Sequence, residues 1–359
     1  MINEPTPERQ PTPDPAGAAA HDALLLLSFG GPEGPDDVMP FLENVVRGKP
    51  VPRERLEAVA EHYALFDGVS PINAQNRALL HALINELNRE GPPLPVYWAN
   101  LYWHPLLEDV LRQMAEEDIR RAACFVTSAY ASYPGCRKYR EAIADARRAV
   151  GPHAPVVEKL RLFYNHPGFV EPMAERLASA LDEVPDDARD AAAVVFTAHS
   201  LPLTMAETCD YVSQLEETCR LVAERAGVGD WRLAYQSRSG PPTQSWLEPE
   251  VGTVAEQLAA AGAGHLVVAP IGFVSEHMEV AYDLDVELAE HCQSLGMGMT
   301  RAATVGCHPR FVRMIRELLA ERIDRDAPRL ALGALGPPPD DCAEGCCPPP
   351  EATRPKPGD

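Results

Sequence analysis

Residues 266–287, LVVAPIGFVSEHMEVAYDLDVE, join a short apolar run to a charged segment at Gly272, and this join decides the fold that we expect. The run 266–271 is β-branched and bounded by breakers, which is typical of a buried parallel strand. Ser275 is the expected N-cap of a helix over 276–291. The sequence therefore predicts a strand, a loop and a helix, with the loop where α/β folds place their sites.

An acidic row lies on the expected helix. Glu279, Asp283 and Glu287 fall at i, i+4 and i+8, which places them on one helix face with about 6 Å between neighbours. His277 stands two residues before this row. Spacing alone favours the solvated face of an amphipathic helix over a functional row, so another feature of the chain has to distinguish these two interpretations.

The rest of the chain alternates between short apolar runs and helical stretches. In the first half we expect strands at 23–29, 96–101, 123–130 and 156–163, and helices at 36–46, 53–66, 74–89, 105–117 and 137–150. In the second half we expect strands at 192–198, 232–236, 266–271 and 300–305, and helices at 207–225, 249–261, 276–291 and 309–323. This α/β pattern predicts two similar doubly wound, Rossmann-like domains, each with a four-stranded parallel sheet, and a ligand cleft at the carboxyl ends of the strands.

A short internal echo places the boundary between the two domains. HPGFV at 166–170 follows the fourth strand of the first half, and HPRFV at 308–312 follows the fourth strand of the second. Each proline stands where a helix is expected to begin, so a common helix entry explains the echo as well as duplication does. We expect a disordered arm at 1–20, domains at 21–165 and 166–328, and a tail rich in proline and cysteine at 329–359.

Composition narrows the class of protein. The 359 residues carry 53 acidic and 32 basic side chains, a formal charge of −21, which argues against binding to nucleic acids or anionic membranes. The proline-rich first twenty residues lack the apolar core of a signal peptide, and no run approaches the length of a membrane span. We therefore expect a cytoplasmic protein whose nine cysteines are reduced thiols or metal ligands more readily than disulfides.

Two strand ends carry candidate functional residues. SFGGPEGP at 28–35 has neither the spacing nor the amide donors of a phosphate loop, so a tight turn against a flat apolar ligand is the better interpretation. VVFTAHSLP at 194–202 places His199 at the carboxyl end of a predicted strand. By topology, His199 and the acidic row project into the same cleft.

Four stretches together resemble the ferrochelatase family. They are LLSFGGPEGP at 26–35, DGVSPIN at 67–73, TAHSLP at 197–202 and PIGFVSEHMEVAYDLDVE at 270–287. The resemblance extends from about residue 22 to residue 323 and implies a chelatase-like fold. It is strongest to the actinobacterial branch, which implies coproporphyrin III as the substrate.

The resemblance also implies roles for particular residues. It implies that His199 and Glu279 are the catalytic residues that bind Fe2+, and that Asp283 and Glu287 continue from them as an acidic relay. It further implies contacts to the porphyrin, because the positions that make such contacts in bacterial members are Ser70 and Tyr139 in this chain.

The chain departs from the family pattern at three positions. Phe29 stands where some members have a tyrosine that ligates the product iron, and phenylalanine cannot do so. Basic residues that some members offer to the propionates of the substrate are Val46 and His62 here, although Arg47 lies nearby. Product ligation and propionate contacts therefore differ from those of these members.

The cysteines give a second signal. CAEGCC at 342–347 lies in the proline-rich tail, and Cys136 lies in the first half. Some ferrochelatases similarly take one [2Fe-2S] ligand from the middle of the chain and three from the C-terminus, so we expect a cluster held by Cys136, Cys342, Cys346 and Cys347. The alternatives are a structural zinc and an adventitious disulfide. The other five cysteines are expected to be packing residues: Cys124, Cys209, Cys219, Cys292 and Cys307.

The expected function is the insertion of ferrous iron into coproporphyrin III in haem biosynthesis. Three alternatives stay open: a protoporphyrin IX ferrochelatase, a non-catalytic haem or porphyrin carrier, and an enzyme for another tetrapyrrole such as a cobalt chelatase. The intact set of His199 and the acidic row argues against a carrier. We expect a monomer whose partners are its two substrates and the upstream and downstream enzymes of the haem pathway.

Overall fold

The structure is a computed structural model that describes residues 21–240, 243–324 and 326–349. The expected disordered arm at 1–20 and the last ten residues of the expected tail lie outside the described residues. No helix of the described part is both long enough and apolar enough to cross a membrane.

Within the described residues, eight strands form two separate parallel sheets with the same order of strands. The first sheet runs β2-β1-β3-β4, with β1 at Ala23–Ser28, β2 at Val96–Asn100, β3 at Arg121–Val126 and β4 at Val156–Lys159. The second runs β6-β5-β7-β8, with β5 at Ala192–His199, β6 at Trp231–Gln236, β7 at His265–Ala269 and β8 at Gly298–Arg301. The expected fold class, two similar halves each with a four-stranded parallel sheet, is confirmed.

Helices connect the strands in both halves. In the first half they are α1 (Pro35–Val45), α2 (Arg53–Ala64), α3 (Ile72–Glu90), α4 (Leu107–Glu116), the π-helical turn η1 (Tyr133–Arg137) and α5 (Lys138–Val150). In the second half they are α6 (Pro167–Asp182), the 3-10 turn η2 (Arg189–Ala191), α7 (Leu203–Ala206), α8 (Tyr211–Ala226), α9 (Val251–Ala260), α10 (Met278–Ala281), the π-helix η3 (Asp283–Leu288), α11 (Ala289–Ser294) and α12 (Pro309–Ile323).

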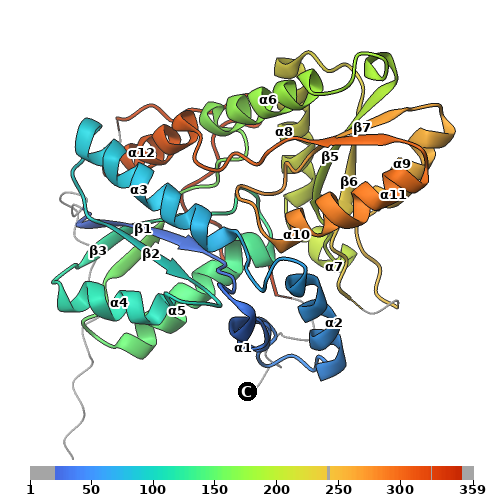
Figure 1. Cartoon of the computed structure of the whole chain (residues 1–359). Coiled ribbons are helices and arrows are strands. Elements are labelled where there is room, and N and C mark those ends of the chain that lie inside the picture. The colour runs from blue at the N-terminus through green and yellow to red at the C-terminus, as the bar shows by residue number, and fades with distance from the viewer. Residues whose placement is uncertain (1–20, 241–242, 325, 350–359) are drawn as a thin grey trace, which may run out of the picture.

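The helix that follows the last strand of each sheet packs against the other sheet. The first sheet has α4 and α5 on one face and α3 together with α12 on the other (Figure 1). Conversely, α6 follows the last strand of the first sheet but packs against α8 and the strands β7 and β8 of the second. The domain boundary expected near residue 165 thus falls where α6 begins, whereas α12, which follows the second sheet, lies on the first.

The exchanged helices join the two halves into one continuous apolar core. Phe311 of α12 packs against Phe125 of β3 and Phe163, with ring centroids 5.9 and 5.8 Å away. A buried ion pair adds a polar tie, because Arg161 donates to both carboxylate oxygens of Glu321, at 2.6 and 2.8 Å. Arg161 also donates to the carbonyl of Leu330 at 2.8 Å, which docks the start of the tail. These contacts fix the position of the second half relative to the first.

The two HP sequences are structurally equivalent helix entries. His166 is the N-cap of α6 and accepts from the amide of Gly168 at 3.0 Å, while His308 is the N-cap of α12 and accepts from the amide of Arg310 at 3.3 Å. Each ring nitrogen satisfies an amide that the first helical turn leaves without a partner. His166 is fully buried, whereas His308 bonds the carboxylate of Glu175 at 3.0 Å.

Burial of His166 predicts a pH-dependent loss of stability. Burial and the nearby charges of Arg161 and Arg310 lower the pKa of His166 from 6.5 to about 3, with Glu317 Oε2 at 3.7 Å as the facing carboxylate. The unfolded chain therefore binds a proton below pH 6.5 that the folded chain excludes, so this contribution to stability is present above pH 6.5 and is lost as the pH falls. Between pH 7.5 and pH 5 the expected loss is about 2 kcal/mol.

Urea unfolding of the wild type and of His166→Asn at these two pH values checks this expectation. Asparagine keeps an N-cap acceptor without a titrating ring, so the variant should lose less stability between the two pH values. An equal loss in both proteins would show that His166 is not the group responsible.

Candidate functional site

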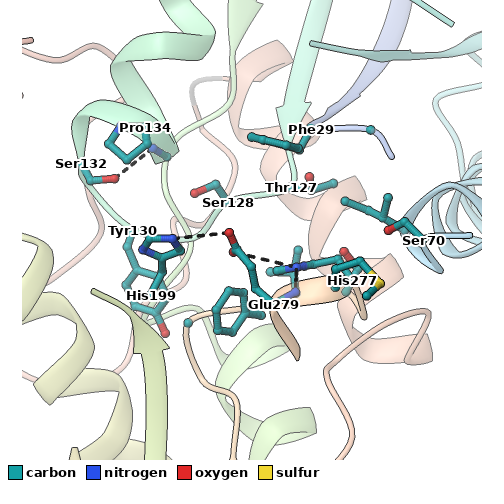
Figure 2. A pocket seen from close by; sticks show the side chains of 18 of the residues that line it. Phe29, Ser70, Thr127, Ser128, Tyr130, Ser132, Pro134, His199, His277 and Glu279 are labelled. Carbon is teal, nitrogen blue, oxygen red and sulfur yellow. Dashed lines mark hydrogen bonds and ion pairs between the residues drawn. The ribbon is translucent and has the colours of Figure 1, made fainter. Parts of the chain in front are cut away.

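An imidazole and a carboxylate meet at the centre of the cleft. His199 is the last residue of β5, and Glu279 lies in the short helix α10 that follows β7. His199 Nε2 lies 3.4 Å from Glu279 Oε1, and Figure 2 shows the two side chains pointing toward one another. The structure thus brings together the two residues that the sequence predicted as the catalytic pair.

A glycine allows the loop after β7 to approach the end of β5, which brings His199 and Glu279 together. A Cβ atom on Gly272 would lie 2.7 Å from both Cα and Cβ of Ala198, closer than real Cβ atoms approach. The amide of Gly272 instead donates to the carbonyl of Thr197 at 3.0 Å, which holds the loop after β7 against the end of β5. Tyr130 from the first half donates to the carbonyl of Ile271 at 2.9 Å and fixes the same loop from the other side.

The pair is ionised at neutral pH. Burial lowers the pKa of His199, but the charge of Glu279 and its hydrogen bond outweigh burial and raise the pKa of the imidazole to about 9. Burial raises the pKa of Glu279, whereas His199 lowers it to about 2 in sum. His199 and Glu279 therefore form an imidazolium and a carboxylate that stabilise one another.

His277 lies on the other side of the Glu279 carboxylate and caps the helix that carries it. It is the N-cap of α10, because its Nδ1 accepts from the amide of Glu279 at 3.2 Å, and this replaces the cap expected at Ser275. Burial lowers the pKa of His277, so the ring is neutral at pH 7. Its Nδ1 also lies 3.9 Å from Glu279 Oε2, which leaves Glu279 between two imidazoles.

The acidic row is not on one regular α-helix, so the helix expected over 276–291 is wrong. The helix α10 ends at Ala281, and the π-helix η3 follows from Asp283 to Leu288. The carbonyl of Tyr282 accepts from the amides of both Val286 and Glu287, at 3.1 and 3.0 Å, which marks the change from i+4 to i+5 bonding. The three acidic side chains therefore do not have the even spacing of an α-helix.

Two residues at the end of β6 hold the start of this segment, and sequence reasoning did not single them out. The side-chain amide of Gln236 donates to the main-chain carbonyl of Glu279, and the hydroxyl of Ser237 donates to the carboxylate of Asp283. Burial raises the pKa of Asp283 to about 7 despite the bond from Ser237. Gln236 ends a predicted strand and pairs with His199 in the register of the sheet, and Ser237 follows it. This position at a strand end could have identified both as site residues.

The inner cavity, of about 270 Å³, is lined by His199 and Glu279. Its walls come from both halves, and the predicted substrate residues Ser70 and Tyr139 line it. Phe29 closes one side and packs against Tyr102 with the two rings tilted, 4.6 Å between ring centroids. Further hydroxyl groups that the sequence did not reveal also line it, from Thr127, Ser128, Tyr130, Ser132 and Tyr211. An apolar slot with scattered hydroxyls suits a flat aromatic ligand that carries polar substituents.

The outer cavity, of about 960 Å³, adjoins the inner one. Phe29, Phe41, Tyr63, Met278 and Glu279 line both cavities. The remaining members of the acidic row, Asp283 and Glu287, line only the outer cavity. The acidic row thus leads from the outer cavity to Glu279 and His199 in the inner one.

The expected cluster ligands lie in pairs. Cys342 donates a hydrogen bond to the buried thiol of Cys136, and Cys346 contacts Cys342. Cys347 has a φ of 46° and donates instead to Cys209, which the sequence analysis took for a packing residue. Over the described ranges, no group of three or more His, Cys, Asp or Glu side chains is arranged to hold a metal ion, so the four expected thiols do not form a preassembled metal site.

The surroundings of these thiols nevertheless fit thiolate ligands. Lys159 Nζ lies 3.1 Å from Cys136 Sγ, and Arg140 Nη2 lies 4.0 Å from Cys346 Sγ. The bond from Cys342 and the charge of Lys159 lower the pKa of Cys136 to about 5 against the effect of burial. Cationic neighbours favour the ionised form that binds metals.

Comparisons with known proteins agree on one family. The family model described as Ferrochelatase matches residues 21–323. The chain is 55% identical over 350 residues to the coproporphyrin III ferrochelatase of Frankia alni, covering 94% of this chain and 88% of that protein. It is 53% identical over 329 residues to the ferrochelatase of Rhodopirellula baltica, covering 91% and 93%.

Similarity to other relatives and to a solved structure extends over most of the chain. The coproporphyrin III ferrochelatase of Streptomyces coelicolor is 49% identical over 358 residues, covering 94% of this chain and 96% of that protein. The solved structure of SirB from Bacillus subtilis with Fe3+ has a TM-score of 0.52 at 14% identity, covering 84% of this chain and 97% of that one. This last similarity concerns the fold alone.

The ion pair between His199 and Glu279 predicts that the pKa of His199 depends on Glu279. In Glu279→Gln the imidazole keeps its burial but loses the carboxylate, so the pKa of His199 should fall from about 9 to about 6.5 or below. NMR titration of the histidine ring signals measures this change. Asp285→Asn is the matched control, because Asp285 pairs with Arg301 at 2.9 Å and should leave His199 unchanged. A pKa of His199 that is insensitive to Glu279→Gln would contradict the ion pair.

Proposed function

The chain belongs to the ferrochelatase family, and we propose that it inserts ferrous iron into coproporphyrin III to give Fe-coproporphyrin III in haem biosynthesis. The observation that carries this proposal is the pair of His199 and Glu279 inside an apolar cavity, at the inner end of an acidic row. Similarity of about 50% to coproporphyrin III ferrochelatases over most of the chain favours coproporphyrin as the porphyrin.

The chemistry requires a metal ligand and a proton acceptor at the same place. Iron insertion exchanges one ferrous ion for the two protons on the pyrrole nitrogens of the porphyrin. Carboxylate oxygen and imidazole nitrogen are suitable ligands for divalent iron, although they do not select iron strictly over zinc or cobalt. We assign the metal to Glu279 and His199, since both side chains line the inner cavity. The imidazolium of His199 must first release its Nε2 proton to solvent, because only the neutral ring has a lone pair that can bind iron or accept a pyrrole proton.

The acidic row completes the path. Asp283 and Glu287 line the outer cavity beyond Glu279, where they attract a hydrated cation and can relay released protons outward. Ser70 and Tyr139 line the inner cavity and offer hydroxyl groups to the porphyrin substituents. The side chains of the two halves would then hold the macrocycle against the catalytic pair.

We predict that His199→Ala and Glu279→Gln each lower turnover by about 100-fold or more while the fold persists, because both residues face the cavity and not the core. The assay is anaerobic incubation with ferrous iron and coproporphyrin III, followed by absorbance, with protoporphyrin IX as the comparison substrate. Asp283→Asn and Glu287→Gln should cost less, since water can bypass a relay.

Circular dichroism of each variant controls for folding. Near wild-type turnover in either His199→Ala or Glu279→Gln would refute the role given to that residue. Faster wild-type turnover of protoporphyrin IX than of coproporphyrin III would assign the enzyme to the other substrate.

We also propose a [2Fe-2S] cluster held by Cys136, Cys342, Cys346 and Cys347. Support comes from the contacts among the first three thiols and from the cations Lys159 and Arg140 beside them. When bound, such a cluster supplies iron–thiolate bonds that tie the tail to the first half. Arg137 already donates to the carbonyl of Cys346 at 3.0 Å and so helps to dock this tail.

The expected outcome is a coloured protein with about two irons and two sulfides per chain. Cys136→Ser and Cys342→Ser should each bleach the visible absorbance and lower the melting temperature. Cys307→Ser is the matched control, because the thiol of Cys307 is half-buried and contacts the main-chain carbonyl of Gln75. Colourless protein after anaerobic purification, or bound zinc in place of iron, would contradict the cluster and leave the chelatase proposal intact.

A further inference from the structure

The peptide group between His199 and Ser200 is held on both of its sides. The carbonyl of His199 accepts a hydrogen bond from the hydroxyl of Tyr211 at 3.0 Å. The amide of Ser200 belongs to the same peptide group and donates to the main-chain carbonyl of Gln236 at 2.8 Å. Because a peptide group is planar, bonds to its carbonyl and to its amide together fix its orientation. The backbone that carries the imidazole therefore cannot rotate without breaking one of these bonds.

The imidazole is also bonded to the next carbonyl along the chain. Nδ1 of His199 donates to the main-chain oxygen of Ser200, because a carbonyl can only accept. This bond sets the direction of the other ring nitrogen, so that Nε2 faces Glu279 and lies 3.4 Å from its Oε1 (Figure 2). While the bond lasts, Nδ1 keeps its proton, so the proton is released from Nε2 and Nε2 is the atom that can then bind iron.

The side chain of Ser200 anchors this carbonyl to a second segment of the chain. Ser200 is buried, and its hydroxyl donates to the main-chain carbonyl of Leu247 at 3.0 Å. The amide of Leu247 in turn donates to the carbonyl of Leu201 at 2.8 Å, and an antiparallel bridge joins Pro202 to Trp246. The acceptor of the Nδ1 proton is thus fixed by a short paired segment beyond the end of β5.

Tyr211 is placed to act on the backbone and not on a ligand. It is the first residue of α8, it is buried, and it lines the inner cavity. Burial raises the pKa of Tyr211 far above its usual range, so its hydroxyl stays protonated and remains a donor. Because this proton is bonded to the carbonyl of His199, the hydroxyl acts through His199.

We propose that Tyr211 and Ser200 are positioning residues for His199: they hold its peptide group and the acceptor of its Nδ1 proton, and so direct Nε2 toward Glu279 and the inner cavity. This inference rests on the proposed function and deepens it. Imidazoles that bind metals usually donate their other ring N–H to an acceptor that orients the ring. Loss of such an orienting partner typically lowers metal affinity or activity by about 10–100-fold.

NMR of the nitrogen-15-labelled full-length protein without added metal or porphyrin tests the positioning directly. At pH 7 the ring of His199 is charged, so Nδ1 carries a proton, and its bond to Ser200 should protect that proton from exchange with water. The signal is assigned by its absence in His199→Gln. In Tyr211→Phe, which removes one oxygen and keeps the ring, the proton should exchange at least about tenfold faster. Ser200→Ala should change the signal in the same direction.

Turnover gives a second readout that a merely structural role would not produce. In the anaerobic assay, the kcat of Tyr211→Phe should fall by about tenfold or more, because Nε2 is no longer held in place. The KM for coproporphyrin III should change by less than about twofold, since the phenyl ring still lines the cavity.

Tyr97→Phe is the matched control, because the hydroxyl of Tyr97 donates to the carboxylate of Glu117 outside both cavities and should affect neither readout. An unchanged Nδ1 signal in Tyr211→Phe or in Ser200→Ala would overturn the role of that residue. A raised KM with an unchanged kcat in Tyr211→Phe would also overturn it, since that result indicates direct contact with the porphyrin. A wild type that inserts no iron would instead overturn the proposed function, whereas the NMR signal, which needs neither substrate, still decides the positioning.

Discussion

The ion pair between His199 and Glu279 is the interaction on which the rest of the site depends. One side chain comes from the end of β5 and the other from α10 after β7, and each charge stabilises the other. The loop after β7 must therefore lie directly against β5. This is possible because Gly272 has no side chain. Bonds from Gln236 and Tyr130 then hold this loop from opposite sides, so β6 and the first half both serve the same contact.

Around this pair the structure separates three environments that a chelation reaction needs. The inner slot is apolar with hydroxyl groups, which suits the face of a macrocycle. The outer cavity carries carboxylates such as those of Asp283 and Glu287, which suit a hydrated cation, and it also carries the cations Lys49, Arg55 and Arg238. Because Glu279 lines both cavities, the two oppositely charged substrates converge on one side chain.

Much of this arrangement could be predicted because it depends on local pattern. The strand before His199 and the HP helix entries follow from apolar runs and helix caps, which are properties of adjacent residues. The π-helix η3 could not be predicted, because the local spacing of residues does not mark a change to i+5 bonding. The contact of Asp283 with Ser237 likewise joins residues that are distant in the chain. The same holds for Cys209, whose contact with Cys347 arises only when the tail folds back.

The exchange of helices between the halves also sets the order in which the protein can be completed on the ribosome. The apolar face of the first sheet that carries Phe125 is covered by α12, which begins about 180 residues after β3 ends. At about 5–20 residues per second, synthesis of that interval takes roughly 10–40 s. During this time the part of that face that α3 leaves uncovered stays exposed on the nascent first half.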